Sequence, residues 1–320
     1  MLFIICYFAR FSLLLSREIL NTTDSEMSVK DLNHLMGTAI SQLSDCSTMG
    51  GMFHENCDGT TLPSGAALEE IVALCRAILF PGFFGNSNIN SQTLQHHIGV
   101  NVERLYELLD EQIRAVEGPS EAAAQMVQKL PELRSILATD VEAAYNGGPA
   151  ATGRTEVICC YPVIKAVTNY RIAHALVELG VPLIPRIITE MAHSETGIDI
   201  HPEAQIGHHF TIDHGTGVVI GATCIIGNHV KLYQGVTLGA KSFPLDEKGH
   251  PIKGIPRHPI LEDNVIVYSN ATILGRITIA KGTVIGGNLW VTESTQPGEQ
   301  LVQARKRRSY DIRPEDFGGL

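Results

Sequence analysis

The chain has 320 residues, of which 44% are hydrophobic and 18% are charged, and its formal net charge is −10. This composition is typical of a globular protein with a sizeable core, and the length suggests about two domains. The negative charge argues against a nucleic-acid-binding surface, which needs clustered positive side chains.

Residues 1–66 are predicted to form an N-terminal extension that is partly disordered. Residues 2–15 are apolar, but Arg10 interrupts them, no small-residue cleavage site follows, and they are too few to cross a bilayer. An extra N-terminal helix, or a translation start at Met27, is favoured over a signal peptide, and no membrane association is expected. The seven cysteines include no Cys-x-x-Cys pair, which favours a reducing compartment and predicts a cytoplasmic protein.

Residues 67–196 are predicted to form an all-α domain, because apolar residues recur there at helical spacing. Pro131 is placed in the first turn of one of these helices, where a missing N–H is tolerated. The predicted helices cover residues 68–79, 94–116, 120–129, 131–145, 163–179 and 184–193.

From Ile200 onward, aliphatic side chains recur every six residues. Each hexad is read as one flat strand and one corner, so that three hexads close a triangular coil of a parallel β-helix. An α-helix does not explain the spacing, because six steps of about 100° do not return to one face. Short sandwich strands are the alternative, but their turns do not keep strict phase. The β-helix is predicted over residues 197–296, with a tail at 297–320. The repeated positions are Ile200, Ile206, Ile212, Ile220, Ile226, Leu232, Leu238, Leu261, Val267, Ile273, Ile279, Ile285 and Val291.

The repeat first fails between Ile212 and Ile220, where the step is eight residues and includes His214. Counting three sides per coil places the side of Ile220 on the side of Ile200, so this corner lies above the corner that contains Asp199. A carboxylate beside an imidazole can orient the ring and leave its second nitrogen free as a base. A surface histidine and a turn-capping aspartate are the non-catalytic alternatives.

The second failure is the loop at residues 240–259, which ends in Arg257-His258-Pro259. A loop of this length on a compact solenoid is usually functional or mobile. Arg257 has the shape to hold a carboxylate bidentately, and His258 is a second polar contact. A solvated loop with an arginine at its foot is the alternative.

Four motifs together resemble the serine O-acetyltransferases of the hexapeptide-repeat acyltransferase family. The resemblance runs in order from about residue 138 to about residue 291 and includes the segment Asn169-Tyr170-Arg171-Ile172-Ala173-His174. The motifs are Gly197-Ile198-Asp199-Ile200-His201-Pro202, Ile212-Asp213-His214-Gly215-Thr216-Gly217, Gln234-Gly235-Val236-Thr237-Leu238-Gly239 and Arg257-His258-Pro259.

The resemblance implies an N-terminal helical domain, a left-handed parallel β-helix and a homo-oligomer, either a trimer or a dimer of trimers. It implies acetyl transfer from acetyl-CoA to L-serine in cysteine biosynthesis, with acetyl-CoA in the groove between neighbouring β-helices and no metal. His214 would be the general base and Asp199 would orient it. Asp213 would meet the serine ammonium, Arg257 would meet the carboxylate, and His258 would complete the catalytic pocket. The side chains that contact CoA are not assigned.

Three departures from the family pattern bear on these expectations. Gly148 stands before Pro149-Ala150, where the family usually has an aspartate, and the loop before Arg257 is longer than in compact members. The chain ends in Gly318-Gly319-Leu320 and not in the isoleucine by which many members insert into cysteine synthase, so that partnership is uncertain.

The basic run Arg305-Lys306-Arg307-Arg308 is interpreted as a solvated tail or as a contact for cofactor phosphates.

Three other functions compete with serine acetylation. An acetyltransferase acting on a sugar, or on another small alcohol or amine, would share the repeat and a histidine but would not need Arg257. A zinc carbonic anhydrase is suggested by His208, His209, His214 and His229, but zinc ligands must converge on one ion. His208 and His209 are expected to point to opposite faces if extended, so that at most one of them fits beside His214. A non-enzymatic scaffold would leave both irregular corners idle.

Overall fold

The computed structural model describes residues 29–55, 62–85 and 88–303, which divide into two units, one up to Cys57 and one from Asp58. In the first unit, α2 (Val29–Leu43) and the 3₁₀ helix η2 (Cys46–Thr48) contain no buried residue. The predictions for residues 1–28, for the basic run at 305–308 and for the final residues lie outside the described residues. No helix among the described residues has the length and apolar character needed to cross a membrane.

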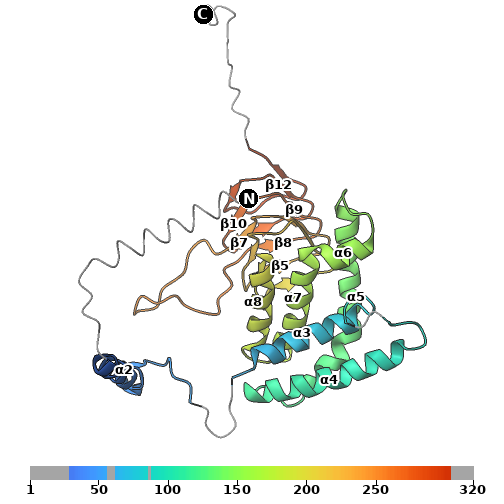
Figure 1. Ribbon diagram of the computed structural model, residues 1–320. Helices are drawn as coiled ribbons and strands as arrows, with labels where there is room; N and C mark the ends of the chain where they lie inside the picture. The colour runs from blue at the N-terminus through green and yellow to red at the C-terminus, as the bar shows by residue number, and fades with distance from the viewer. Residues whose placement is uncertain (1–28, 56–61, 86–87, 304–320) are drawn as a thin grey trace, which may run out of the picture. The chain divides into compact units, whose positions relative to one another are not determined.

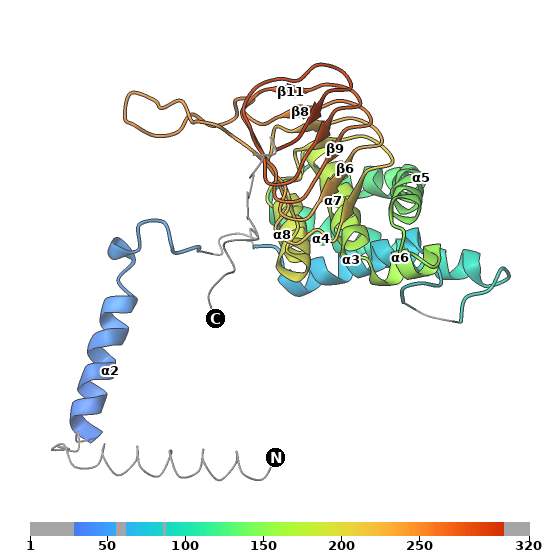
Figure 2. The same cartoon turned by 90° about the horizontal axis from the view of Figure 1, so that it is seen from above.

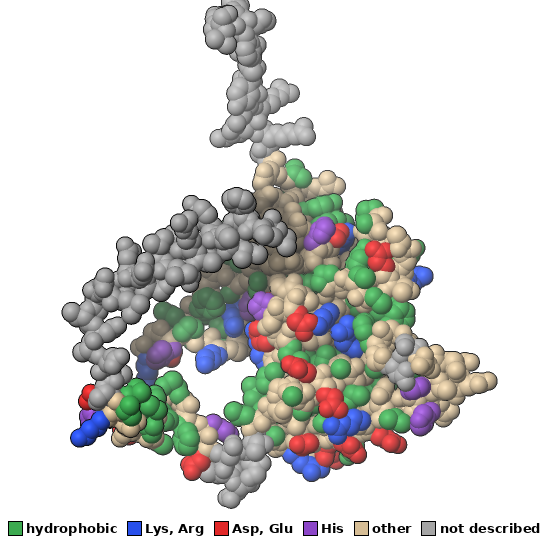
Figure 3. Space-filling model, in the orientation of Figure 1, with side chains coloured by type: hydrophobic (Ala, Val, Ile, Leu, Met, Phe, Trp, Pro, Cys, Tyr) green, Lys and Arg blue, Asp and Glu red, His purple; other side chains and the backbone are tan. Residues whose placement is uncertain are grey.

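The helices of the second unit follow the apolar stripes of the sequence closely. Buried side chains at Leu68, Ile71 and Cys75 confirm the first stripe, and the Ser64 hydroxyl caps that helix by accepting from the Ala67 N–H. In the view of Figure 3, acidic and basic side chains are interspersed over these helices. The helices are α3 (Gly65–Leu79), α4 (Leu94–Ala115), α5 (Ala122–Gly147), α6 (Arg154–Cys160), α7 (Pro162–Glu178) and α8 (Ile184–Thr196).

The prediction of separate helices at 120–129 and 131–145 is wrong, because α5 runs through Pro131 without a break. Proline in a helix interior lacks an N–H donor and disfavours the helix. Leu130 and Leu133, on either side of it, are both buried in the same core, so packing outweighs the lost hydrogen bond. The seven-residue helix α6 was not predicted, since its sequence is too short to show a helical period.

The C-terminal half is a left-handed parallel β-helix, as predicted. Its strands form three parallel sheets: a first sheet β1-β4-β7-β10-β13, a second sheet β2-β5-β8-β11 and a third sheet β3-β6-β9-β12-β14. Figure 1 shows the coils stacked above α7 and α8. The strands are β1 (Asp199–Ile200), β2 (Gln205–Ile206), β3 (Thr211–Asp213), β4 (Val219–Ile220), β5 (Ile225–Ile226), β6 (Lys231–Tyr233), β7 (Thr237–Gly239), β8 (Ile260–Leu261), β9 (Ile266–Val267), β10 (Thr272–Leu274), β11 (Thr278–Ile279), β12 (Val284–Ile285), β13 (Trp290–Val291) and β14 (Gln300–Leu301).

The repeated aliphatic residues lie inside the prism in the register that the period predicts. Ile200 pairs with Ile220, Ile220 with Leu238, and Leu238 with Ile273, and each of these side chains is buried. The sheets meet at three edges. The corner at residues 213–218 lies on the third–first edge, the corner at 221–224 on the first–second edge, and the corner at 207–210 on the second–third edge.

Side chains of α7 cap the open end of the first coil, which otherwise would present unpaired carbonyl groups. The Tyr170 hydroxyl donates to the Ala204 carbonyl at 2.6 Å, and the Arg171 guanidinium donates to the Gly207 carbonyl at 2.6 Å. The buried Asp140 lies 3.2 Å from Arg171 and accepts from the Phe210 N–H. Burial raises the pKa of Asp140 to about 6, although the Arg171 charge opposes the shift. The helical domain thus caps the first coil of the solenoid.

The segment between β7 and β8 leaves the coils as a long excursion, which projects from the solenoid in Figure 2. Leu245 and Pro251 form an antiparallel bridge within it, and the Asp246 N–H donates to the His250 carbonyl at 2.8 Å. The excursion returns to the prism at Arg257 and His258, on the first–second edge.

Candidate active site

The widened corner on the third–first edge folds as it does because of two adjacent residues in the left-handed region. His214 has a φ of 58° and Gly215 a φ of 99°. A Cβ on Gly215 would lie 2.5 Å from Ile198 Cδ1, so only glycine fits this turn. The turn projects the His214 side chain away from the core, and 75% of that side chain is exposed.

The predicted stacking of this corner on the Asp199 corner is confirmed. Asp199 pairs with Val219, and the Gly217 N–H donates to the Gly197 carbonyl at 2.8 Å. The side chains nevertheless have other partners: the Asp199 carboxylate lies 3.4 Å from Arg186 Nη1, and the His214 ring lies 3.8 Å from the Asp213 carboxylate. Among the described residues no hydrogen bond joins His214 to Asp199, so that contact stays a prediction.

Asp213 belongs to a charged cluster that the sequence did not indicate. Its carboxylate lies 3.1 Å from Lys231 Nζ, which also donates to the Gly147 carbonyl at 2.7 Å. Burial alone would lower the pKa of Lys231, but the hydrogen bonds that its ammonium donates to Tyr233 and Asp213, together with the Asp213 charge, outweigh burial and raise the pKa. Lys231 therefore stays charged, and it ties the end of α5 to the third sheet.

A pocket of about 380 Å³ lies between α5, α6–α7 and this corner. Gly148, one of the departures noted from the sequence, lines it, and Asp213 is the acidic group among its lining residues. The lining residues are Gly148, Pro149, Ala150, Tyr161, Pro162, Val163, Ile212, Asp213 and His214. The pocket thus offers one imidazole, one carboxylate and the Tyr161 phenol on a mainly apolar wall.

The first–second edge holds the other two predicted residues, Arg257 and His258. His258 is only 7% exposed, and its Nδ1 accepts from the Thr223 N–H at 3.0 Å. Burial, followed by the charges of Arg257, His201 and Arg276, lowers its pKa to about 4. Because Nδ1 is the acceptor, the neutral ring carries its proton on Nε2 and offers a fixed N–H donor.

Arg257 has unused hydrogen-bonding capacity. Its Nε is buried without a hydrogen-bond partner among the described residues, and its guanidinium carbon lies 5.9 Å from the centre of the Phe243 ring. A buried donor without an acceptor is costly, so an incoming acceptor at this point would be favoured. A carboxylate matches the guanidinium fork best.

Sequence reasoning missed several polar residues that hold these groups in place. The Thr223 hydroxyl accepts from the backbone N–H groups of Arg257 and His258, and Arg276 donates to the Thr223 carbonyl at 2.6 Å. All of them lie at one corner position on successive coils. Counting corners across coils, in the way used for Asp199 and His214, would have found them.

The structure separates the five predicted residues into two groups within one chain. Asp199, Asp213 and His214 lie at the third–first edge, whereas Arg257 and His258 lie at the first–second edge. The first sheet lies between the two edges.

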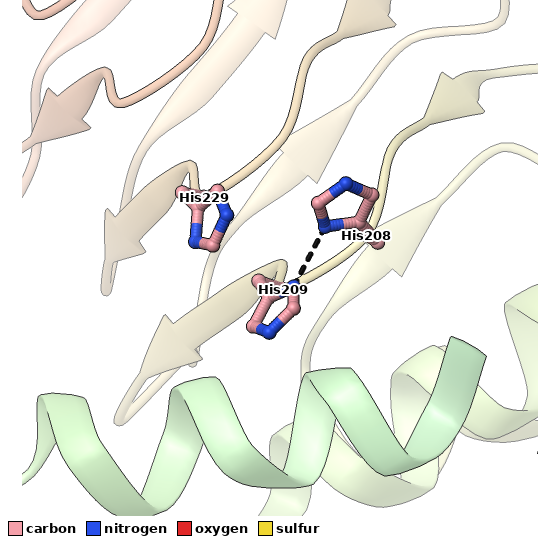
Figure 4. A group of neighbouring side chains, drawn as sticks. All are labelled: His208, His209 and His229. Atoms are coloured by element: carbon pink, nitrogen blue, oxygen red, sulfur yellow. Dashed lines mark hydrogen bonds between the residues drawn. The ribbon is translucent and has the colours of Figure 1, made fainter. Parts of the chain in front are cut away.

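The expectation that His208 and His209 point to opposite faces is wrong. His209 has a φ of 56°, so the pair is not extended, and both rings gather with His229 at the second–third edge (Figure 4). His214 lies at a different edge, so the two sets of histidines do not converge within one chain.

Several known proteins are similar to the chain. It is 48% identical over 265 residues to the plasmid serine acetyltransferase of Synechococcus elongatus, and the alignment covers 77% of this chain and 83% of that relative. It is 40% identical over 190 residues to the serine acetyltransferase of Bacillus licheniformis, covering 57% of this chain and 84% of that relative. Serine acetyltransferase 1 of Entamoeba histolytica, solved in complex with L-cysteine, matches the fold with a TM-score of 0.66 at 36% identity, covering 82% of this chain and 94% of that one. No protein-family model matches the sequence.

Proposed function

Because the chain belongs to the serine acetyltransferase family, we propose that it transfers the acetyl group of acetyl-CoA to the hydroxyl of L-serine. The products are O-acetyl-L-serine and CoA, and the reaction supplies cysteine biosynthesis. The observation that carries this choice of acceptor is the buried Arg257 Nε, which has no hydrogen-bond partner in the part of the chain that the structure describes. An amino-acid carboxylate would satisfy it, whereas a sugar acceptor has no such group.

His214 acts as the general base in this proposal. A serine hydroxyl is a weak nucleophile until its proton is removed, and a solvent-accessible imidazole suits that step. His214 takes the proton as the hydroxyl oxygen attacks the thioester carbonyl carbon, and the tetrahedral intermediate collapses as the C–S bond breaks. The imidazolium then returns the proton to the CoA sulfur. Asp199, on the coil beneath, orients the ring once the ring turns toward it.

Asp213 binds the serine ammonium, and Arg257 binds its carboxylate. The Asp213 charge is shared with Lys231, which fixes the carboxylate in place and moderates its pull on the ammonium. His258 donates from Nε2 as a neutral ring, because its pKa lies well below physiological pH. Its role is a directed hydrogen bond and not proton removal.

A complete site needs two copies of the chain, since its two halves lie on different edges of one prism. The outer face of the first sheet, between those edges, leaves Val219 37% and Trp290 71% exposed. These side chains align in one column through Thr237 and Thr272. A neighbouring prism packed on this face would cover them and bring its first–second edge to the His214 corner. We therefore propose a trimer, alone or paired into a hexamer, with acetyl-CoA between neighbouring prisms.

The test is CoA thiol release from acetyl-CoA with L-serine, L-homoserine or N-acetylglucosamine as acceptor. L-serine is expected to be the preferred acceptor, with L-homoserine weaker because its hydroxyl is one methylene further from the bound carboxylate. L-cysteine, with which the Entamoeba structure was solved, has the same ammonium and carboxylate and should compete with L-serine. Turnover of the sugar without turnover of L-serine would replace this function with sugar acetylation.

A further inference from the structure

Three histidines from two consecutive coils converge at the second–third edge (Figure 4). The ring centres lie 4.8 Å apart for His208 and His209, 5.2 Å for His208 and His229, and 4.3 Å for His209 and His229. One ring nitrogen from each can be chosen so that all three lie within 4.8 Å of one another. The Nδ1 atoms of His208 and His209 are 2.6 Å apart, so at least one of them carries no proton.

The fold does not require imidazoles at this edge. The left-handed corner position of His209 and His229 recurs in the next two coils, where Asn264 has a φ of 61° and Gly282 a φ of 71°. Asparagine and glycine are the usual residues for this conformation. The histidines therefore add chemistry that the corner does not need for its shape.

The backbone holds the three residues in fixed positions. The His208 N–H donates to the Asn228 side chain at 3.0 Å, and the His209 N–H donates to the Thr139 hydroxyl at 3.0 Å. The His229 N–H donates to the His208 carbonyl, also at 3.0 Å. A site on such a scaffold needs only side-chain rotation to close around a ligand.

We propose that His208, His209 and His229 bind a divalent transition-metal ion of the zinc class. Zinc accepts imidazole nitrogens at about 2.0–2.1 Å in tetrahedral geometry, which places ligand nitrogens about 3.3 Å apart. The distances between ring nitrogens, 2.6 Å between Nδ1 of His208 and Nδ1 of His209 and up to 4.8 Å within the group, bracket that value, and small rotations of these side chains reach it. Three protein ligands leave a fourth position for water or for a further group.

Glu142 on α5 is placed to accept a hydrogen bond from one of the metal-binding histidines. Its carboxylate lies 3.8 Å from His209 Nε2, on the far side of the ring from Nδ1. A metal-bound histidine usually donates its second N–H to a carboxylate, which fixes the tautomer and the ring orientation. A bound ion would therefore join the first coil, the second coil and α5. This edge takes no part in the proposed acetyl transfer.

The test uses the full chain, purified without a polyhistidine tag, stripped with a chelator and titrated with Zn²⁺. About one zinc per chain is expected to remain after gel filtration and to raise the unfolding temperature. His229→Asn keeps a residue suited to the corner, as Asn264 shows. It should weaken zinc binding at least tenfold, because loss of a residue that only supports a metal ligand already weakens binding by about tenfold or more. Glu142→Gln should weaken it less. Tetrahedral Co²⁺ absorption in the unaltered chain gives a readout that does not depend on any variant.

His250→Asn is the matched control, because this exposed histidine lies beside a carboxylate, Asp246, outside the cluster. It should leave zinc affinity unchanged. If His229→Asn does not fold, His208→Asn replaces it, since that side chain is exposed. Zinc affinity equal to that of the unaltered chain in His229→Asn or in His208→Asn, or an octahedral Co²⁺ spectrum with no retained zinc, would overturn the proposal.

Discussion

His214 and His258 lie on two edges of the same prism, and their surroundings differ in almost every respect. His214 is exposed, sits in a turn that only glycines allow, and has no hydrogen bond to its ring among the described residues. His258 is buried, its Nδ1 accepts from the Thr223 N–H, and burial together with the charges of Arg257 and Arg276 lowers its pKa. An imidazole side chain is thus accessible and free to rotate at one edge, and buried and fixed in orientation at the other.

The difference matches the two chemical tasks of acyl transfer to an alcohol. A base must take up a proton and release it again, which favours an imidazole that water and substrate can reach. A hydrogen-bond donor must keep its proton and its direction, which favours a buried ring whose pKa lies far below the working pH. The tasks were assigned to these residues by resemblance, and their surroundings support the same division.

Replacing His214 tests the accessible half and should have the largest effect. His214→Ala is expected to lower kcat by about 10²- to 10⁴-fold, the range for loss of a positioned general base. The fold should persist, because the side chain is 75% exposed in the single chain. The oligomer should persist, because its proposed contact is the outer face of the first sheet. The measurement is steady-state CoA release together with size-exclusion chromatography, and His250→Ala is the control for loss of an exposed histidine. Unchanged turnover in His214→Ala would refute the assignment of the base.

Replacing Arg257 tests the fixed half and should act on binding more than on turnover. Arg257→Ala is expected to raise the KM for serine roughly tenfold to a hundredfold, as a lost hydrogen bond to a charged group predicts. The KM for acetyl-CoA should change little. The serine KM of Arg257→Lys should lie between those of the unaltered chain and Arg257→Ala, because lysine keeps the charge but not the bidentate fork. Lys253→Ala removes an exposed cation from the same loop and serves as the control. A serine KM that is the same in all of these variants would disconnect Arg257 from the carboxylate.

The sequence predicted the solenoid well because its signal is a strict period. A buried aliphatic side chain every six residues determines the coil, and counting sides correctly placed Ile220 on Ile200. It predicted the α5 boundaries poorly, since a local rule about Pro131 competes with core packing that only the folded chain reveals.

The candidate site could be predicted only in part for the same reason, because side-chain packing is known only in the folded chain. Corner counting finds which backbones stack, but it does not give side-chain directions. The Asp199–Arg186 pair, the Lys231–Asp213 pair and the three-histidine cluster depend on those directions. The positive φ of His209 is a property of the folded corner, and treating the segment as extended gave the wrong face.

The last expected effect is on stability and not on activity, and it isolates the burial of His258. Its pKa is about 4 in the folded chain against an ordinary value of 6.5, so the unfolded chain binds the extra proton between these values. The contribution of His258 to stability is therefore fully present above about pH 6.5 and is lost as the pH falls toward 4, by up to about 3 kcal/mol. The contribution of Asp140, whose pKa is raised to about 6, changes with pH in the opposite direction in part of this window, so it must be subtracted.

The measurement compares urea unfolding of the unaltered chain and of His258→Asn, which keeps an acceptor for Thr223. The comparison removes the Asp140 contribution, because both chains share it. A smaller loss of stability on acidification is expected in the variant. An equal loss in both chains would mean that His258 takes up a proton in the folded state, and it would then no longer be a fixed donor.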